Sequence, residues 1–219
     1  EEKKVELNLS LTALNDAVAQ QNRQLLERKG MLCVNIMGSP GSGKTSLIEQ
    51  IAPILGKVAV IQGDLESDVD KQRLEKAGIA CYQINTHSGC HLNASMINEA
   101  LMEFCVDAIE YLLIENVGNL VCPAGVAIGQ HMNVVVSSVA EGHDKPQKYP
   151  IIYRDANIVV LSKYNLADVV DFDEATFEGQ VHMLTKASII KTTKQEGFDK
   201  VTHMIAHRRD HLVGREHSH

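Results

Sequence analysis

The sequence lacks tryptophan, and aromatic residues make up only 4% of its 219 positions. It also lacks any apolar run close to the roughly 20 residues that a membrane-spanning helix needs. Acidic residues outnumber basic ones, and the formal net charge of −7 argues against a broad nucleic-acid-binding face. The first residues, Glu1 to Lys4, do not resemble a secretion signal. We therefore expect a protein that binds neither membranes nor nucleic acids.

Cysteines are few and odd in number. They stand at positions 33, 81, 90, 105 and 122, within segments that are predicted to be core. This distribution argues against a disulfide framework and favours a reducing, cytoplasmic location. The length fits one domain with a small appendage, and the hydrophobic content of 44% is ordinary for a globular core.

The most informative segment is residues 38–45, GSPGSGKT, which fills every fixed position of the phosphate-binding pattern GxxxxGK(S/T). In this pattern the backbone N–H groups turn toward a polyphosphate, Lys44 places a positive charge on its β- and γ-phosphates, and the Thr45 hydroxyl ligates Mg²⁺. A strand-length apolar run precedes the loop at 32–37 and a helical pattern follows at 46–52, which favours nucleotide binding over a simple glycine-rich turn. The residues expected to contact nucleotide here are Gly38, Ser39, Gly41, Ser42, Gly43, Lys44, Thr45 and Ser46.

Strands and helices are predicted to alternate along the chain after a first amphipathic helix at 7–29, which ends at Gly30. The predicted strands are 32–38, 57–63, 80–85, 111–117, 133–140, 157–162 and 187–191. The predicted helices are 44–53, 67–77, 92–104, 173–185 and 198–207. This alternation predicts an α/β fold with a mostly parallel seven-stranded sheet, helices on both faces, and ligands at the carboxyl ends of the strands.

Two acidic residues end predicted strands next to the phosphate loop. Asp64 follows the strand at 57–63, and Glu115 lies at the end of an apolar run that begins at Tyr111. A carboxylate there can hold Mg²⁺ directly or through water, or position the attacking water. The alternative for Asp64 is a cap on the next helix. For Glu115 a functional partner is favoured, because a charged side chain in a buried strand is costly without one.

Cys90, His91 and Cys122 form a candidate metal site. Sulfur and imidazole ligands suit Zn²⁺ or Ni²⁺. Cys90 and His91 are adjacent, so both can ligate one ion only from a loop or a helix start. One chain offers too few ligands for a closed tetrahedral site, and a two-fold axis would supply a second set. By spacing alone, incidental core cysteines are an equally good interpretation.

Several strings in fixed order carry a family resemblance. They are residues 38–45, 63–64, 88–92, 114–123, 141–142 and 148–150. Together they resemble the HypB family, the nickel-handling GTPases of [NiFe]-hydrogenase maturation, over about residues 12–205. The segment ENVGNLVCP at 115–123 is the most specific piece. The related urease-type nickel GTPases look different there and are the alternative.

The resemblance implies a P-loop GTPase that dimerises on nucleotide and couples GTP hydrolysis to Ni²⁺ delivery. It implies catalytic roles for Lys44, Asp64 and Glu115, with Thr45 and Asp64 near Mg²⁺ and residues 115–118 standing where many GTPases carry DxxG. It also implies a Ni²⁺ or Zn²⁺ site at the dimer interface built from the Cys90, His91 and Cys122 set. The implied partners are a HypA-type nickel carrier and the hydrogenase large-subunit precursor.

On this interpretation the chain divides into an N-terminal helical extension at 1–30, a P-loop GTPase domain at 31–207 and a His-rich tail at 208–219. The helix at 7–29 is either a docking element or a helix packed on the sheet. The histidines toward the carboxyl end, His207, His211, His217 and His219, form either a weak Ni²⁺ or Zn²⁺ binder or part of a solvated remnant. Lys148 matches a family lysine near the interface, with a solvated loop lysine as the alternative.

The chain departs from the family pattern in its base-reading motif. Where (N/S)KxD is expected, Ser162 and Lys163 are present but Asn165 replaces the aspartate. An Asn side chain carries both an acceptor and a donor, so it cannot repeat the charge-assisted pair that Asp makes with guanine. We still expect Lys163 and Asn165 to contact the base. Compared with a chain that carries aspartate, guanine selectivity should be weaker, or the site should prefer a xanthine-like base. Residues 191–194 do not match the later base-contacting element, and His143 stands where Asp is expected.

Three functions are compatible with these residues. The first is a GTPase switch that carries nickel, with slow intrinsic turnover because no arginine finger is evident. The second is a nickel- or zinc-binding protein whose nucleotide site is degenerate, which the Asn165 substitution motivates. The third is an ATP-dependent small-molecule kinase, although residues 90–91 and 115–123 have no evident role in one.

Overall fold

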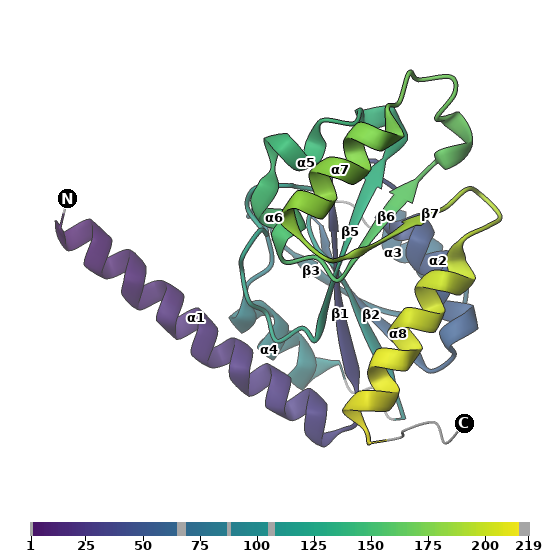
Figure 1. The fold of residues 1–219 in the computed structure, drawn as a ribbon. Coiled ribbons are helices and arrows are strands. Elements are labelled where there is room, and N and C mark those ends of the chain that lie inside the picture. Colours follow the sequence, from purple (N-terminus) through teal and green to yellow (C-terminus); the bar gives the residue numbers. More distant parts are fainter. Residues whose placement is uncertain (1, 65–68, 87–88, 105–107, 215–219) are drawn as a thin grey trace.

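The computed structural model describes residues 2–64, 69–86, 89–104 and 108–214, and these form a sheet flanked by helices (Figure 1). The strands are β1 (Leu32–Gly38), β2 (Val58–Asp64), β3 (Ala80–Asn85), β4 (Tyr111–Glu115), β5 (Met132–Ser138), β6 (Ile158–Ser162) and β7 (Ser188–Lys191). The helices are α1 (Glu2–Arg28), α2 (Lys44–Leu55), α3 (Val69–Lys76), α4 (Ala94–Glu103), α5 (Lys145–Lys148), α6 (Pro150–Arg154), α7 (Glu174–Leu184) and α8 (Phe198–Leu212). Two 3₁₀ turns lie at Val139–Glu141 and Tyr164–Leu166.

The seven strands of the described chain are ordered β3-β2-β4-β1-β5-β6-β7, and every neighbouring pair is parallel. The predicted α/β class and the seven-stranded sheet are confirmed. Strands β1, β4 and β6 are buried along their whole length. Burial on both faces explains why they read as continuous apolar runs rather than as alternating patterns. Parallel pairing brings the ends of β1, β2 and β4 to the same edge of the sheet.

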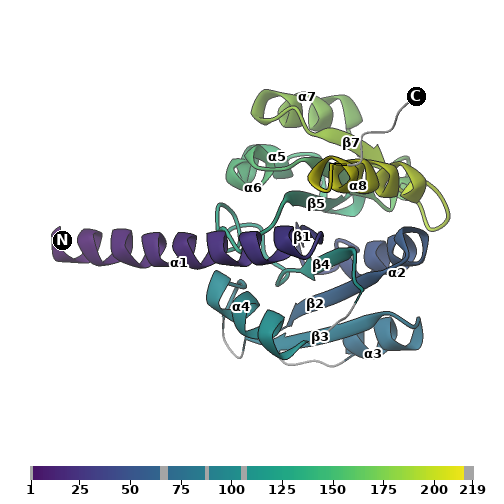
Figure 2. The ribbon, with the colours of Figure 1, turned by 90° about the horizontal axis from the view of Figure 1, so that it is seen from below.

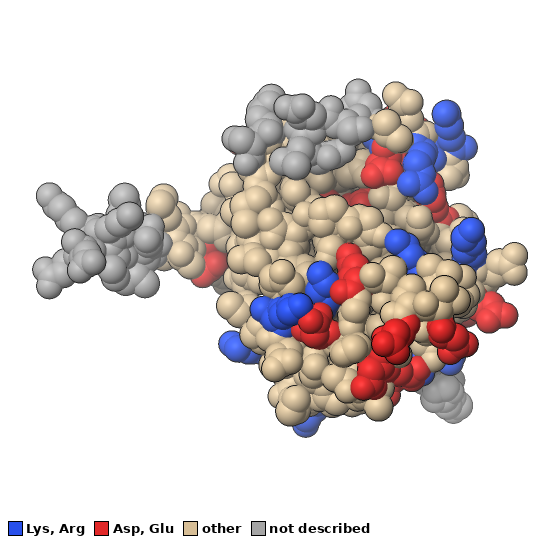
Figure 3. All heavy atoms as spheres, turned by 90° about the horizontal axis from the view of Figure 1, so that it is seen from above, with Lys and Arg blue, Asp and Glu red and all other residues tan. Residues whose placement is uncertain are grey.

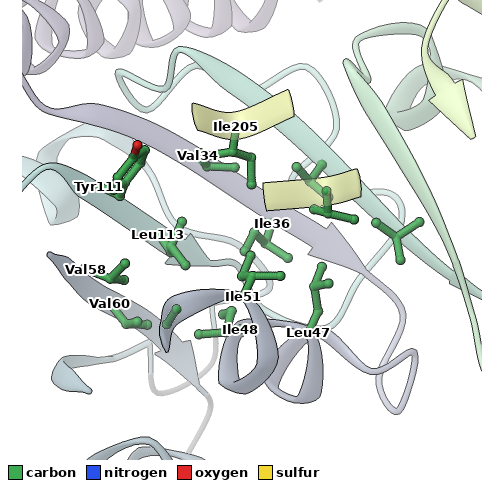
Figure 4. Packing of buried hydrophobic residues seen from close by; sticks show 14 of the residues in the cluster. Val34, Ile36, Leu47, Ile48, Ile51, Val58, Val60, Tyr111, Leu113 and Ile205 are labelled. Carbon is green, nitrogen blue, oxygen red and sulfur yellow. The ribbon is translucent and has the colours of Figure 1, made fainter. Parts of the chain in front are cut away.

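Helices cover both faces of the sheet. Helices α2, α3 and α8 pack on one face, where Ile48, Ile51 and Ile205 meet Val34 and Ile36 of β1 (Figure 4). Helices α4, α6 and α7, with the end of α1, cover the other face. Because successive strand residues point to opposite faces, β1 supplies both cores. Burial of these side chains is the main stabilising contribution to the fold.

Helix α1 divides into a part that projects from the domain and a part that packs on it (Figures 1 and 2). Leu11 and Leu14 are exposed, whereas Leu26 is fully buried. Asn22 is also buried, and its amide donates to the carbonyls of Ala94 and Ile128 at 2.8 and 3.2 Å. The C-terminal half of α1 is therefore part of the domain.

The structure differs from the predicted elements mainly at the start of the first helix, which begins at Glu2 rather than at 7, between β5 and β6, and at the end of the last helix. Helices α5 and α6 have Pro near their first position and are too short to show an apolar repeat, so the sequence pattern missed them. Helix α8 continues to Leu212, past the predicted end at 207, and its last turn includes His211. Within the described residues, no helix is long and apolar enough to cross a membrane.

Candidate nucleotide and metal site

The phosphate loop joins β1 to α2 at the carboxyl edge of the sheet. Gly41 and Gly43 have φ values of 73° and 103°, which side chains rarely adopt, and Gly43 is the N-cap of α2. A Cβ on Gly38 would lie 2.4 Å from the Val136 carbonyl oxygen. These glycines are therefore required by backbone conformation and by close packing against β5.

The phosphate loop contains buried polar side chains. The hydroxyls of Ser39 and Ser42 are buried and have no hydrogen-bond partner within the described part of the chain. Lys44 is buried, and its Nζ donates to the carbonyls of Gly38 and Ser39 at 3.3 and 3.1 Å. Buried donors without partners are costly, and phosphate oxygens at the N-terminus of α2 would satisfy them. The loop therefore fits a polyphosphate.

Glu115 joins the phosphate loop to two strands. Its Oε1 accepts a hydrogen bond from the Thr45 hydroxyl at 2.7 Å, and its Oε2 accepts one from the Gln62 amide at 3.0 Å. Burial raises the pKa of the Glu115 carboxyl, and the Thr45 hydrogen bond and the charge of Lys44 oppose that rise. A hydroxyl and a carboxylate oxygen side by side are the hard donors that Mg²⁺ prefers.

Asp64, the second predicted acid, is the last residue of β2, but its side chain lies outside the described residues. Helix α3 is described from Val69 onward, and residues 65–68, which join it to Asp64, lie outside the described residues. Most of the predicted switch segment at 64–70 also lies outside the described set.

Two cavities adjoin the loop and share Gly43, Ser46 and Lys163. The first, of about 450 Å³, lies along the phosphate loop and the ends of β2 and β4, and it includes Thr45, Gln62 and Glu115. The second, of about 570 Å³, extends from Leu47 to Phe198. A triphosphate in the first cavity would place its base in the second.

The second cavity carries the residues predicted to read the base. Asn165 lines it together with Lys163, Thr192, Thr193 and Lys194. The Ser162 hydroxyl donates to the Ser42 carbonyl at 2.6 Å, and Lys163 Nζ donates to the Gly41 carbonyl at 2.8 Å. The segment after β7 therefore lies beside the base cavity, although its sequence does not match the family element.

The candidate metal ligands converge, but in an oxidised form. Cys90 and Cys122 form a disulfide with their Cα atoms 5.9 Å apart, and His91 Nδ1 lies 3.7 Å from Cys90 Sγ. The sequence argued against a disulfide framework, and this one pair forms because residues distant in sequence meet at one edge of the sheet. The disulfide removes both thiolates, and no group of three or more possible ligands is assembled to hold a metal ion among the described residues. Cys33 and Cys81 are free, and Cys105 lies outside the described set.

Side-chain amides connect the candidate metal ligands to the carboxyl edge of the sheet. The Asn116 Oδ1 accepts from the backbone N–H of Leu92 at 3.2 Å, next to His91. Asn119 Oδ1 accepts from the Cys122 backbone N–H at 3.1 Å, and its amide donates to Cys122 Sγ at 3.5 Å. Leu92 also packs on β2, because a Cβ on Gly63 would lie 2.7 Å from its Cγ. The segment 115–122 thus contacts both the phosphate loop and the cysteine pair.

Three residues of this arrangement escaped the sequence analysis. Gln62 and Asn116 act through partners that are remote in sequence. Arg73 lines the phosphate cavity from α3, where Glu49 and Asp70 hold its guanidinium at 2.7 and 3.0 Å. Arg73 could have been found from its position, because it is a basic residue shortly after the predicted switch segment.

Other highlighted residues lie elsewhere. Lys148 forms an exposed ion pair with Asp144, and the hydrogen bond that it donates to this carboxylate raises the pKa of Lys148. His143 accepts a hydrogen bond from the Asp173 backbone at 3.3 Å and lies edge-on to Phe172. His217 and His219 of the predicted tail lie outside the described residues.

On the side of the molecule seen in Figure 3, basic side chains lie among acidic ones. Within the described surface on that side, they form no continuous basic field.

Comparisons with known proteins agree with this geometry. Residues 32–191 match the family described as CobW/HypB/UreG, nucleotide-binding domain. The chain is 39% identical to the probable hydrogenase maturation factor HypB of Methanocaldococcus jannaschii, over 87% of this chain and 89% of that protein. It is 37% identical to the hydrogenase/urease maturation factor HypB of Helicobacter hepaticus, over 94% and 89% of the two chains.

Solved structures give the same result. The crystal structure of HypB from Helicobacter pylori in complex with nickel superposes with a TM-score of 0.85 and 33% identity, covering 94% of this chain and 98% of that one. The HypB crystal structure from Archaeoglobus fulgidus superposes with a TM-score of 0.82 and 37% identity, covering 91% and 99% of the two chains.

Proposed function

This chain belongs to the CobW/HypB/UreG family of nucleotide-binding domains, and we propose that it is a GTP-hydrolysing metallochaperone that delivers Ni²⁺ during [NiFe]-hydrogenase maturation. The observation that carries the proposal is the short segment 115–122, which hydrogen-bonds to the phosphate loop at Glu115 and to the cysteine pair at Asn119. The similar Helicobacter pylori structure, which was solved in complex with nickel, supports nickel as the cargo.

In the proposed mechanism the phosphate loop binds the triphosphate in place of its present internal contacts. Lys44 leaves the carbonyls of Gly38 and Ser39 and pairs with the phosphates. Mg²⁺ would be held by the Thr45 hydroxyl and the Asp64 carboxylate, and it would neutralise charge on the phosphates. The Thr45 hydroxyl could then still donate to Glu115, and we propose that nucleotide shifts the two side chains together and turns Glu115 toward the attacking water.

The change at Glu115 is transmitted by neighbouring residues of the same segment. A shift at the end of β4 moves Asn116, whose side chain positions the backbone beside His91, and Asn119, which contacts Cys122. The nucleotide state therefore alters the spacing of the metal ligands. The metal ion then binds the two nucleotide states with different affinity, which is what allosteric coupling requires.

Metal binding in this mechanism requires the reduced form. Reduction of the disulfide yields two thiols, and the thiolates with His91 give three ligands per protomer. A second protomer, associated on nucleotide binding, completes a shared Ni²⁺ or Zn²⁺ site. We propose that the protein works in the cytoplasm, where thiols stay reduced.

Partner proteins dock on α1 in this proposal. The projecting half of α1 exposes Leu11 and Leu14, as a helix-recognition surface would. A HypA-type nickel carrier and the hydrogenase large-subunit precursor are the proposed partners.

Phosphate release from GTP by the reduced protein tests the nucleotide half. We expect slow, Mg²⁺-dependent turnover that Lys44→Ala abolishes, whereas Lys57→Ala, an exposed lysine paired with Glu110, leaves it unchanged. Hydrolysis by the Lys44→Ala variant at the wild-type rate would refute the assignment. Asn165, which stands where the family's base-reading motif has aspartate, favours one second candidate, a metal-transfer protein with a degenerate nucleotide site. That candidate predicts that Ni²⁺ transfer continues in Lys44→Ala.

A further inference from the structure

A row of histidines lies on the outer face of α8. Val201, Ile205 and Arg209 are buried on the inner side of this helix. His203, His207 and His211 recur at every fourth residue on the other side, and all three are exposed. Residues four apart lie one above the other on a helix, so these imidazoles are neighbours.

Two of these imidazoles point their Nε2 atoms at each other. The His207 and His211 Nε2 atoms are 3.3 Å apart, and the rings meet edge to face with centroids 4.5 Å apart. Two imidazole nitrogens bound to one tetrahedral ion, each at about 2.05 Å, are separated by about 3.3 Å. The observed spacing matches that of two ligands on one metal ion, and without a metal ion it allows a hydrogen bond between the two rings.

The surroundings suit a cation. His203 and His207 line a groove with the carboxylate residues Asp199 and Asp210. The other walls of the groove are apolar or phenolic, from Ile54 and Leu55 of α2 and Tyr111 of β4. Two exposed basic residues of α8, Lys200 and Arg208, each lie three residues before a histidine of the row and therefore flank it on the same side of the helix.

The row is remote from the nucleotide edge. Val213, just after α8, is the residue that a Cβ on Gly30 would meet, at 3.7 Å. Gly30 precedes β1, so this end of α8 lies at the amino-terminal edge of the sheet, as Figure 1 shows. The phosphate loop leaves β1 at the opposite edge.

We propose that His207 and His211 form a second metal site, which binds a divalent transition-metal ion such as Ni²⁺, Zn²⁺ or Cu²⁺ through both Nε2 atoms. Imidazole is a preferred ligand of these ions, and water completes the coordination. The site needs neither the cysteines nor a bound nucleotide, so it goes beyond the proposed function and can bind metal while the cysteine pair is oxidised.

The test is a calorimetric titration of the whole chain, in its oxidised form, with Ni²⁺ alone. The disulfide closes the cysteine site, so the titration reports on the remaining ligands. We expect one binding event that His207→Gln and His211→Gln each weaken by about tenfold or more, because removal of either ligand destroys the chelate.

Two control variants separate this site from other histidines. His182→Gln, an exposed histidine on α7, and a His217→Gln/His219→Gln pair should both keep the wild-type affinity. Circular dichroism confirms that the variants fold. Unchanged Ni²⁺ affinity in His207→Gln and His211→Gln, or loss of affinity only in the His217/His219 variant, would overturn the proposal.

Discussion

Base selectivity is expected to follow Asn165. This residue lines the base cavity where an aspartate would accept hydrogen bonds from N1–H and the 2-amino group of guanine. The Asn carbonyl accepts one of these, but its NH₂ group then faces the guanine amino group, donor against donor. A hydrogen bond to a charged group contributes about 1.5–3 kcal/mol, and the exposure of Asn165 argues for the lower end.

A loss of about 2 kcal/mol weakens GTP roughly 30-fold relative to a chain with aspartate. Xanthine carries an oxygen at position 2, which accepts from the Asn165 amide, so XTP should bind at least as tightly as GTP. In Asn165→Asp the preference should reverse, with GTP bound roughly 30-fold more tightly and XTP weakened.

Competition of GTP, XTP and ATP against a fluorescent guanine nucleotide measures these ratios. Asp168→Asn, an exposed residue nearby that does not line the cavity, is the matched control for a change of one charge. Wild-type protein that prefers GTP over XTP by more than about tenfold, with the same ratio in Asn165→Asp, would refute the reasoning.

Three further predictions concern stability and redox state. Burial lowers the pKa of His131 to about 4 from its ordinary value of 6.5, so the unfolded chain takes up the proton first as the pH falls. The free energy of unfolding, measured with urea, should therefore keep the full His131 contribution above pH 6.5 and fall by about 3 kcal/mol toward pH 4. A flat profile contradicts this. Gly129→Ala should destabilise by about 2 kcal/mol or more, because φ is 102° and the new Cβ would lie 2.6 Å from Asn22; Gly56→Ala, with positive φ but open space, should cost less in the same assay. Ni²⁺ binding at the cysteine pair should require a reductant, because only thiolates ligate the metal. The measurement is the thiolate–Ni²⁺ charge-transfer difference spectrum. Equal spectra with and without reductant would exclude the cysteine pair as the metal ligands.

The fold was predictable because its signals are local. Strand β1 and the start of α2 matched closely, since the apolar run at 32–37 and the GSPGSGKT loop define them without reference to other segments. Helices α5 and α6 were missed because elements of four or five residues show no helical period.

The site was predictable only in its residue types. The sequence indicated Thr45 and Glu115 separately, but their hydrogen bond joins residues on different elements and depends on the β1–β4 register. Asn116 stands in the family-specific segment 115–123, but its partners could not be predicted, because an asparagine after a strand has many ordinary roles. The disulfide between Cys90 and Cys122 likewise follows from which loops meet in space.

The central claim is that nucleotide and metal are linked through residues 115–122, and the most direct test is Ni²⁺ affinity measured at both nucleotide states. Reduced protein is titrated with Ni²⁺ in the presence of Mg²⁺ and either a non-hydrolysable GTP analogue or GDP, in the His207→Gln/His211→Gln background so that α8 does not contribute. We predict affinities that differ by about fivefold or more, the size of a typical coupling free energy. Equal affinities, with both nucleotides shown to be bound, would contradict the account.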